Sequence, residues 1–297
     1  MEIKPNIPLG KYTSWQVGGP AEFFCLPENL NDLQTAISHA DAKNLKLTVF
    51  GGGSNVLIAD KGVSGLVICL QKFSGTETKE ENGRLHIIAW AGTPKSELLK
   101  IFLKNKLAPA LFLGGIPGDV GGGVVMNAGV AENFLPREFV EITDWVEILR
   151  VGNGRFHTYR FSKDQIHWEY RHTNGWQPGF IIRVGMSWPI EPDATIIEKV
   201  RSANKIRLTK QPLDMPSCGS VFRNPEGHKA AQLIDGCGLK GYQVGDAQVS
   251  LKHANFIVNI GKAKASDIAA IIDHVRATVK KERGIDLHTE VVRIGDF

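Results

Sequence analysis

The chain has 297 residues, of which 42% are hydrophobic and 22% are charged, so it is long enough for two or three domains with a sizeable core. Its formal net charge of +4 is small, and its Lys and Arg residues are spread along the chain, which excludes the basic runs typical of nucleic-acid-binding proteins. This is the composition of an ordinary globular protein, and the weak positive charge is compatible with an anionic small-molecule substrate.

Residues 1–70 are predicted to form a first lobe around a glycine-rich loop. Residues 29–44 carry apolar side chains at the three- and four-residue spacing of a helix. An apolar strand at 45–50 follows, then the loop, and then a second strand at 66–70. This helix–strand–loop–strand order indicates a small domain.

The middle of the chain, residues 71–190, is predicted to be mainly β-structure. Thr93 is expected to cap a helix that has Pro94 at its first position, and a second glycine-rich loop follows that helix. Residues 152–154, Gly-Asn-Gly, are a strong hairpin signal, and a helix-like segment is expected just before Tyr170. Strands are predicted at 85–90, 141–151, 155–161 and 180–188.

Pro189 and Pro192 mark a boundary, beyond which residues 191–297 are predicted to form a compact third portion. Ser266 is expected to cap a helix whose apolar residues recur at helical spacing up to Val279. Further helices are predicted at 193–208 and 228–237, and strands at 255–260 and 291–294. The three portions together predict an α+β fold.

The cysteines and the N-terminal segment bear on location. Cys25, Cys69, Cys218 and Cys237 show neither a C-x-x-C pair nor zinc-ligand spacing, and the 9 histidines are scattered, so we expect free thiols in a reducing compartment and no metal site. The N-terminal segment lacks the basic and apolar regions of a signal peptide. No apolar run approaches the roughly 18 residues of a membrane span. We therefore expect a cytoplasmic protein.

Two glycine-rich loops, at 51–55 and 114–129, are the most informative feature of the chain. Glycine is tolerated at such density where the backbone must adopt positive φ or pass very close to another group, and rows of bare N–H groups form anion-binding concavities. Either loop alone could be a tight surface turn. Both together, with the polar side chains of Ser54, Asn55 and Asn127, favour an elongated anionic ligand such as the pyrophosphate and ribityl chain of a flavin dinucleotide.

The two commonest nucleotide-binding motifs are absent from these loops. Val56 stands where G-x-G-x-x-G requires its third glycine, and no acidic residue follows about twenty positions later. The Walker A pattern is also absent. A Rossmann dinucleotide fold and a P-loop are therefore excluded.

Three polar residues outside the loops could carry chemistry. Ser220 lies in the turn-like segment 217–225, which is not a nucleophile elbow because Phe222 replaces the final glycine of that motif. Ser220 could also be a turn or capping serine. Arg171 could be a surface cation, and Glu290 could be a solvent-facing residue at the end of a strand.

Segments from nearly the whole length of the chain match one known family. They are 13–21, 51–57, 115–118, 126–129, 170–171, 219–225, 238–241, 247–250, 253–259 and the late Glu290. Together they resemble the MurB-type UDP-N-acetylenolpyruvoylglucosamine reductases, flavin-dependent enzymes of bacterial cell-wall synthesis. The length resembles the shorter, second type, which lacks an additional substrate-covering segment.

The resemblance implies a fold and a cofactor. The fold is a two-lobed FAD-binding domain of the vanillyl-alcohol-oxidase (PCMH) type, with lobes at 1–70 and 71–190 and FAD between them, plus a smaller α+β substrate-binding domain at 191–297. FAD is the implied cofactor and NADPH the co-substrate, with no nucleic acid, membrane or obligate protein partner. The implied FAD-binding residues are Gly51, Gly52, Gly53, Ser54, Asn55, Val56, Gly115, Ile116, Pro117, Gly118, Gly122, Asn127, Ala128 and Gly129.

The resemblance also assigns catalytic roles. Hydride passes from flavin N5 to the vinyl β-carbon of the enolpyruvyl ether, and the product is UDP-N-acetylmuramate. Arg171 matches the cation that stabilises charge growing on the substrate carboxylate. Ser220 matches the general acid that protonates the α-carbon, and Glu290 matches a second carboxylate contact that has to be protonated to help. Tyr170 and Asn224 complete the implied substrate-binding set with Arg171 and Glu290.

Two positions depart from the family pattern. Thr173 replaces a serine but keeps a hydroxyl group, so we expect little loss. Asp119 stands where a serine is common, which brings a negative charge near a pyrophosphate. It either caps the following helix and points away or weakens FAD binding.

Two other functions remain open at this level. An FAD-linked oxidase that uses oxygen on an alcohol or sugar predicts no proton donor at Ser220 and no reduction of the flavin by NADPH. A non-catalytic flavin- or nucleotide-binding module leaves Ser220, Arg171 and Glu290 without a role.

Overall fold

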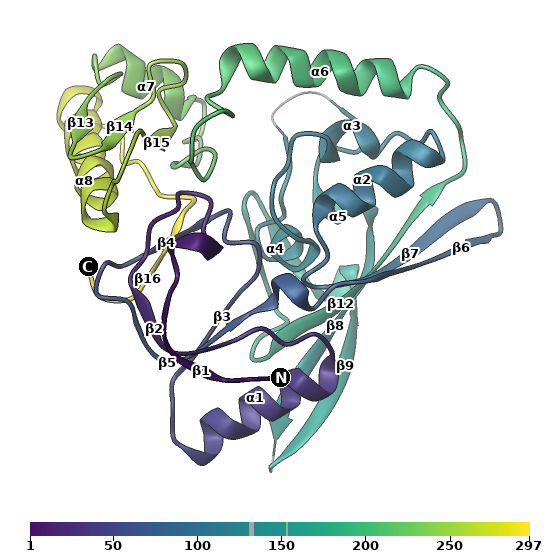
Figure 1. The fold of residues 1–297 in the computed structure, drawn as a ribbon. Coiled ribbons are helices and arrows are strands. Elements are labelled where there is room, and N and C mark those ends of the chain that lie inside the picture. Colours follow the sequence, from purple (N-terminus) through teal and green to yellow (C-terminus); the bar gives the residue numbers. More distant parts are fainter. Residues whose placement is uncertain (131–133, 153) are drawn as a thin grey trace. The chain divides into compact units, whose positions relative to one another are not determined.

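The computed structural model describes residues 1–130, 134–152 and 154–297, and their contacts cluster into two compact units (Figure 1). Both units are discontinuous in sequence. Unit 1 comprises Met1–Glu2, Cys25–Gly52 and Ile68–Lys205, whereas unit 2 comprises Ile3–Phe24, Gly53–Val67 and Ile206–Phe297. The mixture of helices and antiparallel strands confirms the α+β fold class. The sequence-based division at residues 70 and 190 stays a prediction.

Unit 1 is built on a five-stranded antiparallel sheet of order β6-β7-β12-β8-β9. The central strand β12 is buried along most of its length and pairs with β7 on one side and β8 on the other. The glycine-containing turn predicted at 152–154 joins β8 to β9, although Asn153 lies outside the described residues. The strands are β6 (Thr76–Glu81), β7 (Arg84–Trp90), β8 (Thr143–Gly152), β9 (Arg155–Ser162) and β12 (Phe180–Pro189).

Two of the helices of unit 1, α4 and α5, pack on this sheet, and α4 is part of the second glycine loop. Helix α4 contacts both β7 and β12, and the loop runs from the end of α3 through α4. The strand β3 (Leu47–Phe50) leads into the first glycine loop, and β10 (His167–Glu169) and β11 (His172–Asn174) form a small hairpin around Tyr170-Arg171. The helices are α1 (Leu30–Ala42), α2 (Lys95–Lys104), α3 (Ala110–Leu113), α4 (Val120–Val125) and α5 (Phe139–Ile142).

Unit 2 combines segments from both ends of the chain. The strand β4 (Val56–Ile58) pairs in parallel with β16 (Val292–Ile294), more than two hundred residues later. The other elements are the antiparallel pair β1 (Lys4–Pro8) and β2 (Pro20–Cys25), the sheet β13 (Gln243–Val244), β14 (Ala247–Val249) and β15 (Ile257–Asn259), and the helices α7 (Ala230–Gly236) and α8 (Ala265–Arg283). The boundary between the units falls within β5 (Val63–Cys69) and α6 (Ile196–Lys210), and at the last residue of β2.

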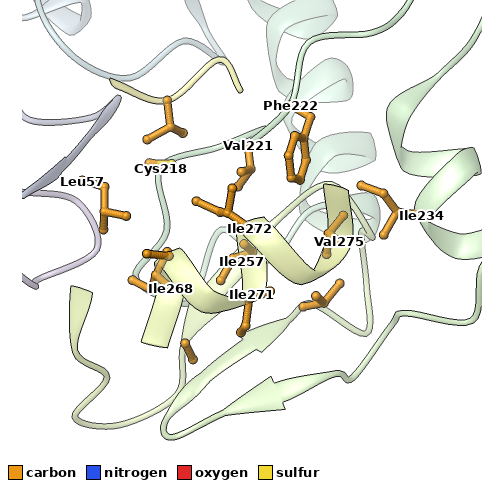
Figure 2. Close-up of a cluster of buried hydrophobic side chains, with 14 of the residues drawn as sticks. Leu57, Cys218, Val221, Phe222, Ile234, Ile257, Ile268, Ile271, Ile272 and Val275 are labelled. Atoms are coloured by element: carbon orange, nitrogen blue, oxygen red, sulfur yellow. The ribbon is translucent and has the colours of Figure 1, made fainter. Parts of the chain in front are cut away.

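An apolar cluster stabilises unit 2 (Figure 2). The predicted amphipathic face of α8 lies at its centre, and Ile268, Ile271, Ile272 and Val275 belong to the same cluster as Cys218, Val221 and Phe222. Trp15 is fully buried and donates its indole N–H to the Ile257 carbonyl at 2.7 Å. Burial of each such side chain contributes roughly 1.5–3 kcal/mol, so this cluster fixes the segment that carries Ser220.

Three local predictions were wrong, and each error has a tertiary cause. Thr93 does not cap α2, because its hydroxyl exchanges two hydrogen bonds with the backbone of Gly75, and Pro94 stands at the N-cap instead. The helix-like segment before Tyr170 is a 3-10 turn followed by β10. Ser266 lies inside the first turn of α8 and does not cap it.

The N-terminus of α8 is capped by a residue distant in sequence. The Asp60 carboxylate accepts hydrogen bonds from the N–H groups of Ala265 at 2.8 Å and Ser266 at 2.9 Å. Burial alone would raise the pKa of Asp60, but the hydrogen bonds from Ser266 and Ala265 hold it below its usual value.

Asp60→Ala should lower the free energy of unfolding by about 1 kcal/mol, as expected for a lost helix cap. Because the folded-state pKa is depressed, the contribution is present above the pKa of an unfolded Asp, about 3.9, and disappears as the pH falls through the folded-state value. Urea unfolding at pH 7 and at pH 3 measures both. Asp60→Asn, which keeps one acceptor oxygen, is the control; equal losses for both variants at pH 3 and pH 7 would contradict the capping role.

Candidate functional site

The first glycine loop turns sharply between β3 and β4. Gly53 has φ +64°, and a Cβ atom there would lie 1.9 Å from the carbonyl oxygen of Tyr12, so no other residue fits. The N–H groups of Gly53, Ser54 and Asn55 donate to no protein acceptor in the described part of the chain. Three successive unpaired N–H groups in a turn are the kind of feature that binds an anion, and their contact with FAD stays a prediction.

The second glycine loop serves two different purposes. Gly118 has φ +89°, which favours glycine at the turn before α4. Gly121 and Gly123 instead permit close packing, since a Cβ atom on Gly123 would lie 2.5 Å from the ring of Phe139. Part of the glycine density therefore comes from packing of α4 and not from a ligand.

Asp119 links the two loops inside unit 1. It is the N-cap of α4, accepts a hydrogen bond from the Gly122 N–H at 3.0 Å, and accepts another from the Gly52 N–H. The side chain is 5% exposed, and burial raises its pKa above the usual value despite these hydrogen bonds and the charge of Lys95. It therefore caps the helix, and its carboxylate also lies against the first loop.

The end of the second loop is ordered by Asn127. This residue is 2% exposed and has φ +37°. Its side-chain oxygen accepts from the Val140 N–H at 3.1 Å, and its Nδ2 donates to Glu138 Oε2 and to the Glu169 carbonyl, both at 3.1 Å. The side-chain amide of Asn127 connects the end of the second loop to α5 and to the Glu169 backbone. Its direct contact with FAD stays a prediction.

Arg171 is buried, which rules out the alternative that it is a surface cation. Its side chain is 11% exposed and its backbone has φ +59°. The guanidinium donates to the carbonyls of Gly129 at 2.7 Å and Asn127 at 3.4 Å, and it stacks over the Tyr170 ring at 4.7 Å. The cation is thus held against the end of the second glycine loop.

Glu138 supports Arg171, and the sequence did not reveal it. Its Oε1 lies 3.7 Å from Arg171 Nη1, and its Oε2 accepts from Asn127. Glu138 also stands at the N-cap of α5 and forms an isolated bridge with Gly129. No motif or periodicity marks this residue, because its role depends on the folded loop.

Unit 2 brings three distant segments together. Asn55 of the first loop donates from Nδ2 to the Glu290 carbonyl at 2.9 Å, and its own carbonyl accepts from Val292 at 3.0 Å. The Glu290 N–H in turn donates to the Val221 carbonyl at 2.8 Å, directly after Ser220. Asn55, Glu290 and the segment of Ser220 are therefore neighbours in the backbone of unit 2.

Asn255 fixes the backbone that follows Ser220. Its Oδ1 accepts from the Phe222 N–H at 2.9 Å, its Nδ2 donates to the Phe222 carbonyl at 2.8 Å, and its own carbonyl accepts from Val221 at 2.9 Å. Asn255 is 4% exposed, whereas Ser220 is half-buried. The segment 253–259 matched the family pattern without a stated role, and this anchoring supplies one.

Glu290 is half-buried beside an apolar neighbour. The fully buried Cys218 thiol has a pKa well above its usual value, first because of burial and then because of the nearby Glu290 charge. Asn224, the other predicted substrate contact of unit 2, accepts the Ala230 N–H at 3.0 Å and so orders the start of α7. Its substrate contact stays a prediction.

Comparison with known proteins gives the same family across the full chain. The family model of an FAD binding domain matches residues 21–160, and the model of the UDP-N-acetylenolpyruvoylglucosamine reductase C-terminal domain matches residues 211–294. UDP-N-acetylenolpyruvoylglucosamine reductase from Synechococcus sp. (strain RCC307) is 38% identical and covers 100% of this chain and 95% of the relative. The enzyme from Lactobacillus johnsonii is also 38% identical, over 99% of this chain and 95% of the relative. This chain belongs to the UDP-N-acetylenolpyruvoylglucosamine reductase family.

A solved structure from the same family supports the fold. UDP-N-acetylenolpyruvylglucosamine reductase from Thermus caldophilus is 31% identical, with a TM-score of 0.78 over 99% of this chain and 100% of that one. This member of the reductase family is therefore an FAD-dependent oxidoreductase with an FAD-binding domain of the vanillyl-alcohol-oxidase type. No helix among the described residues is long and apolar enough to cross a membrane.

The residues of this reductase fit FAD. Within unit 2, the unpaired N–H groups of Gly53, Ser54 and Asn55 suit pyrophosphate oxygens, and Gly53 adopts a backbone conformation that allows a close approach. Within unit 1, Gly118 adopts such a conformation as well. Within the described ranges, no group of three or more His, Cys, Asp or Glu side chains could hold a metal ion. The four cysteines are free thiols, as predicted.

The structure explains how Thr173 is accommodated where other family members commonly have serine. Thr173 is 1% exposed; its hydroxyl donates to the Val125 carbonyl at 3.3 Å and accepts from the Trp176 indole N–H at 3.2 Å. Both hydrogen-bonding functions of the hydroxyl are used. The residue orders the β10–β11 hairpin that carries Arg171, and the small effect of the replacement stays a prediction.

Proposed function

We propose that this chain catalyses the NADPH-dependent reduction of UDP-N-acetylglucosamine enolpyruvate to UDP-N-acetylmuramate, a step of peptidoglycan precursor synthesis. The observation that carries the proposal is the hydrogen-bonded sequence Asn55–Glu290–Val221, which joins the first glycine loop to the segment of Ser220. NADPH would supply the hydride and become NADP⁺, and FAD held at the glycine loops would carry that hydride to the vinyl β-carbon. A proton at the α-carbon completes the saturated ether.

Arg171 stabilises the charge that develops on the substrate carboxylate. Hydride addition to the β-carbon pushes electrons toward the α-carbon and its carboxylate, and a fixed cation stabilises that charge most in the transition state. The two carbonyls that hold the Arg171 guanidinium, with Glu138, restrict its motion before substrate binds. We propose that Arg171 and Ser220 act on the same bound substrate molecule.

Ser220 donates the proton to the α-carbon. A serine is a weak acid, so the transfer requires a carbanion-like centre held within hydrogen-bond distance of its hydroxyl. Asn255 fixes the adjoining backbone, and Phe222 and Val221 are buried on the unit 2 core, so the hydroxyl is presented from a rigid segment. The O–H bond breaks as the C–H bond forms, and a solvent-derived proton restores the hydroxyl.

Glu290 contacts the substrate carboxylate in its protonated form. An ionised Glu290 would repel that carboxylate, whereas a neutral carboxyl group can donate a hydrogen bond to it. Its backbone is fixed on both sides by Asn55 and Val221. Glu290 therefore complements Arg171 as a second donor.

The decisive experiment follows NADPH oxidation by the purified flavoprotein with and without the enolpyruvyl sugar nucleotide. We expect an FAD spectrum, bleaching of the flavin by NADPH under anaerobic conditions, and reoxidation by the substrate with formation of UDP-N-acetylmuramate. A protein that reoxidises only with oxygen while oxidising an alcohol or sugar would contradict the proposal and support an oxidase. A protein that binds FAD without turnover of either kind would support a binding module.

A further inference from the structure

Lys95 and Asp119 are two buried charged residues of unit 1 at the second glycine loop, and Asp119 also contacts Gly52 of the first loop. Lys95 is 4% exposed, donates from Nζ to the Pro117 carbonyl at 2.8 Å, and donates from its backbone N–H to the Gly118 carbonyl at 3.0 Å. Asp119 is 5% exposed and accepts from Gly52 and Gly122. A lysine and a carboxylate this deeply buried are retained only where they are paired or hydrogen-bonded, as they are at this position.

The Asp119 carboxylate uses N–H groups that a bound anion would otherwise use. Gly52 and Gly122 both belong to the residues expected to hold the FAD pyrophosphate, and both donate to Asp119. A Cβ atom on Gly51 would lie 1.7 Å from Asp119 Oδ2, which shows how closely the carboxylate is apposed to the first loop. The Asp119 carboxylate therefore occupies two of the N–H donors that are expected to face the pyrophosphate.

Few charges compensate for this carboxylate. Lys95, at the start of α2, is the cation whose charge lowers the pKa of Asp119. The Cys69 thiol, at the end of β5, is the other titratable group that senses it: burial first, and the Asp119 charge in smaller measure, raise the pKa of Cys69 to about 12. Cys69 therefore stays neutral, and among the described residues Lys95 is the cation whose charge offsets that of Asp119.

We propose that Asp119 takes up a proton when FAD binds, so that loading of the cofactor is coupled to protonation of this carboxyl group. The proposal rests on the placement of the FAD pyrophosphate at the glycine loops. The pyrophosphate brings two negative charges into a buried site that already holds a carboxylate, and like charges at close range disfavour ionisation. A neutral carboxyl group removes the repulsion and offers an O–H donor to a phosphate oxygen.

The direction in which FAD affinity changes with pH follows from the coupling between FAD binding and protonation of Asp119. The form that binds FAD is protonated, so affinity is highest below the pKa of Asp119 in the free protein. Above that value the dissociation constant should rise by about tenfold per pH unit, until the pKa in the complex is reached. Burial already raises the pKa of Asp119, which moves this window toward neutral pH.

The test measures FAD binding to the full-length chain after removal of its cofactor. Titration calorimetry from pH 5.5 to 8.5, in phosphate and in Tris, gives both the dissociation constant and the number of protons taken up per FAD. We expect uptake approaching one proton in wild type, and a dissociation constant that rises with pH. In Asp119→Asn, which keeps a cap acceptor for α4, we expect tighter binding at high pH and loss of the slope.

The matched control is Asp144→Asn, a carboxylate of unit 1 that accepts from Ser187 and lies outside the glycine loops. It should retain the wild-type slope and proton count. Zero proton uptake in wild type, or an unchanged slope in Asp119→Asn, would overturn the proposal. If Asp119→Asn does not fold, the wild-type proton count still decides. Failure of wild type to bind FAD at any pH would overturn the FAD placement itself, and with it this proposal.

Discussion

Ser220→Ala should slow turnover of the enolpyruvyl substrate by about 10²- to 10⁴-fold, the range that a positioned general acid contributes. Reduction of the flavin by NADPH should be unchanged, because that half-reaction needs no proton at the substrate α-carbon. The half-reactions are separated by stopped-flow absorbance of the flavin, first with NADPH alone and then with substrate added to the reduced enzyme.

The control for this variant is Ser217→Ala, a half-buried serine of the same segment. It should leave both half-reactions near wild type. Because the backbone after Ser220 is held by Asn255 and not by the serine hydroxyl, Ser220→Ala should also keep wild-type thermal stability. Equal slowing of both half-reactions would show that the serine acts on the flavin site and does not donate the proton.

Arg171→Lys should lower kcat with the enolpyruvyl substrate by about 10²- to 10³-fold, the loss observed when one preorganised donor to a developing charge is removed. Lysine keeps the positive charge but lacks the planar fork that reaches two acceptors at fixed geometry. KM for the substrate should rise as well, while KM for NADPH changes little. Steady-state kinetics with each substrate varied in turn measures this split.

The matched control is Arg150→Lys, another arginine of unit 1 whose guanidinium donates to two backbone carbonyls, those of Trp176 and Pro178. Any loss that comes only from breaking carbonyl contacts should appear in both variants. Loss of FAD from Arg171→Lys, with no kinetic defect in the FAD-saturated protein, would show that Arg171 merely orders the loop end at 127–129.

Local patterns predicted most of the elements because the forces that set them are local. The helical spacing after Asn29 and the apolar runs at β7 and β12 survive in the structure with boundaries shifted by only one or two residues. Capping was predicted less well. Thr93 and Ser266 are sound caps by composition, but Gly75 and Asp60 offer partners that only the folded chain brings near them.

The candidate site also combines features that local sequence predicts with features that depend on tertiary contacts. Glycine loops, Ser220, Arg171 and Glu290 could be named from residue order, because a motif preserves the identity of chemically essential groups. Glu138 and Lys95 could not be named, since each acts through contacts with loop carbonyls or side chains that are formed on folding. Burial distinguishes Lys95, and the contacts with Arg171 and Asn127 distinguish Glu138, from other charged residues.

The sequence by itself determined the family, the α+β class, the FAD cofactor and the identity of the residues expected to act. Only the tertiary structure decided that Asp119 is a buried cap shared by two loops, that Arg171 is held by Asn127 and Gly129, and that Asn55, Glu290 and the Ser220 segment are hydrogen-bonded neighbours. The physical reason is the separation along the chain between the groups that interact. Motifs and periodicity record which groups are present, whereas burial and hydrogen-bond partners come from segments as far apart as β4 and β16, which meet only in the folded chain.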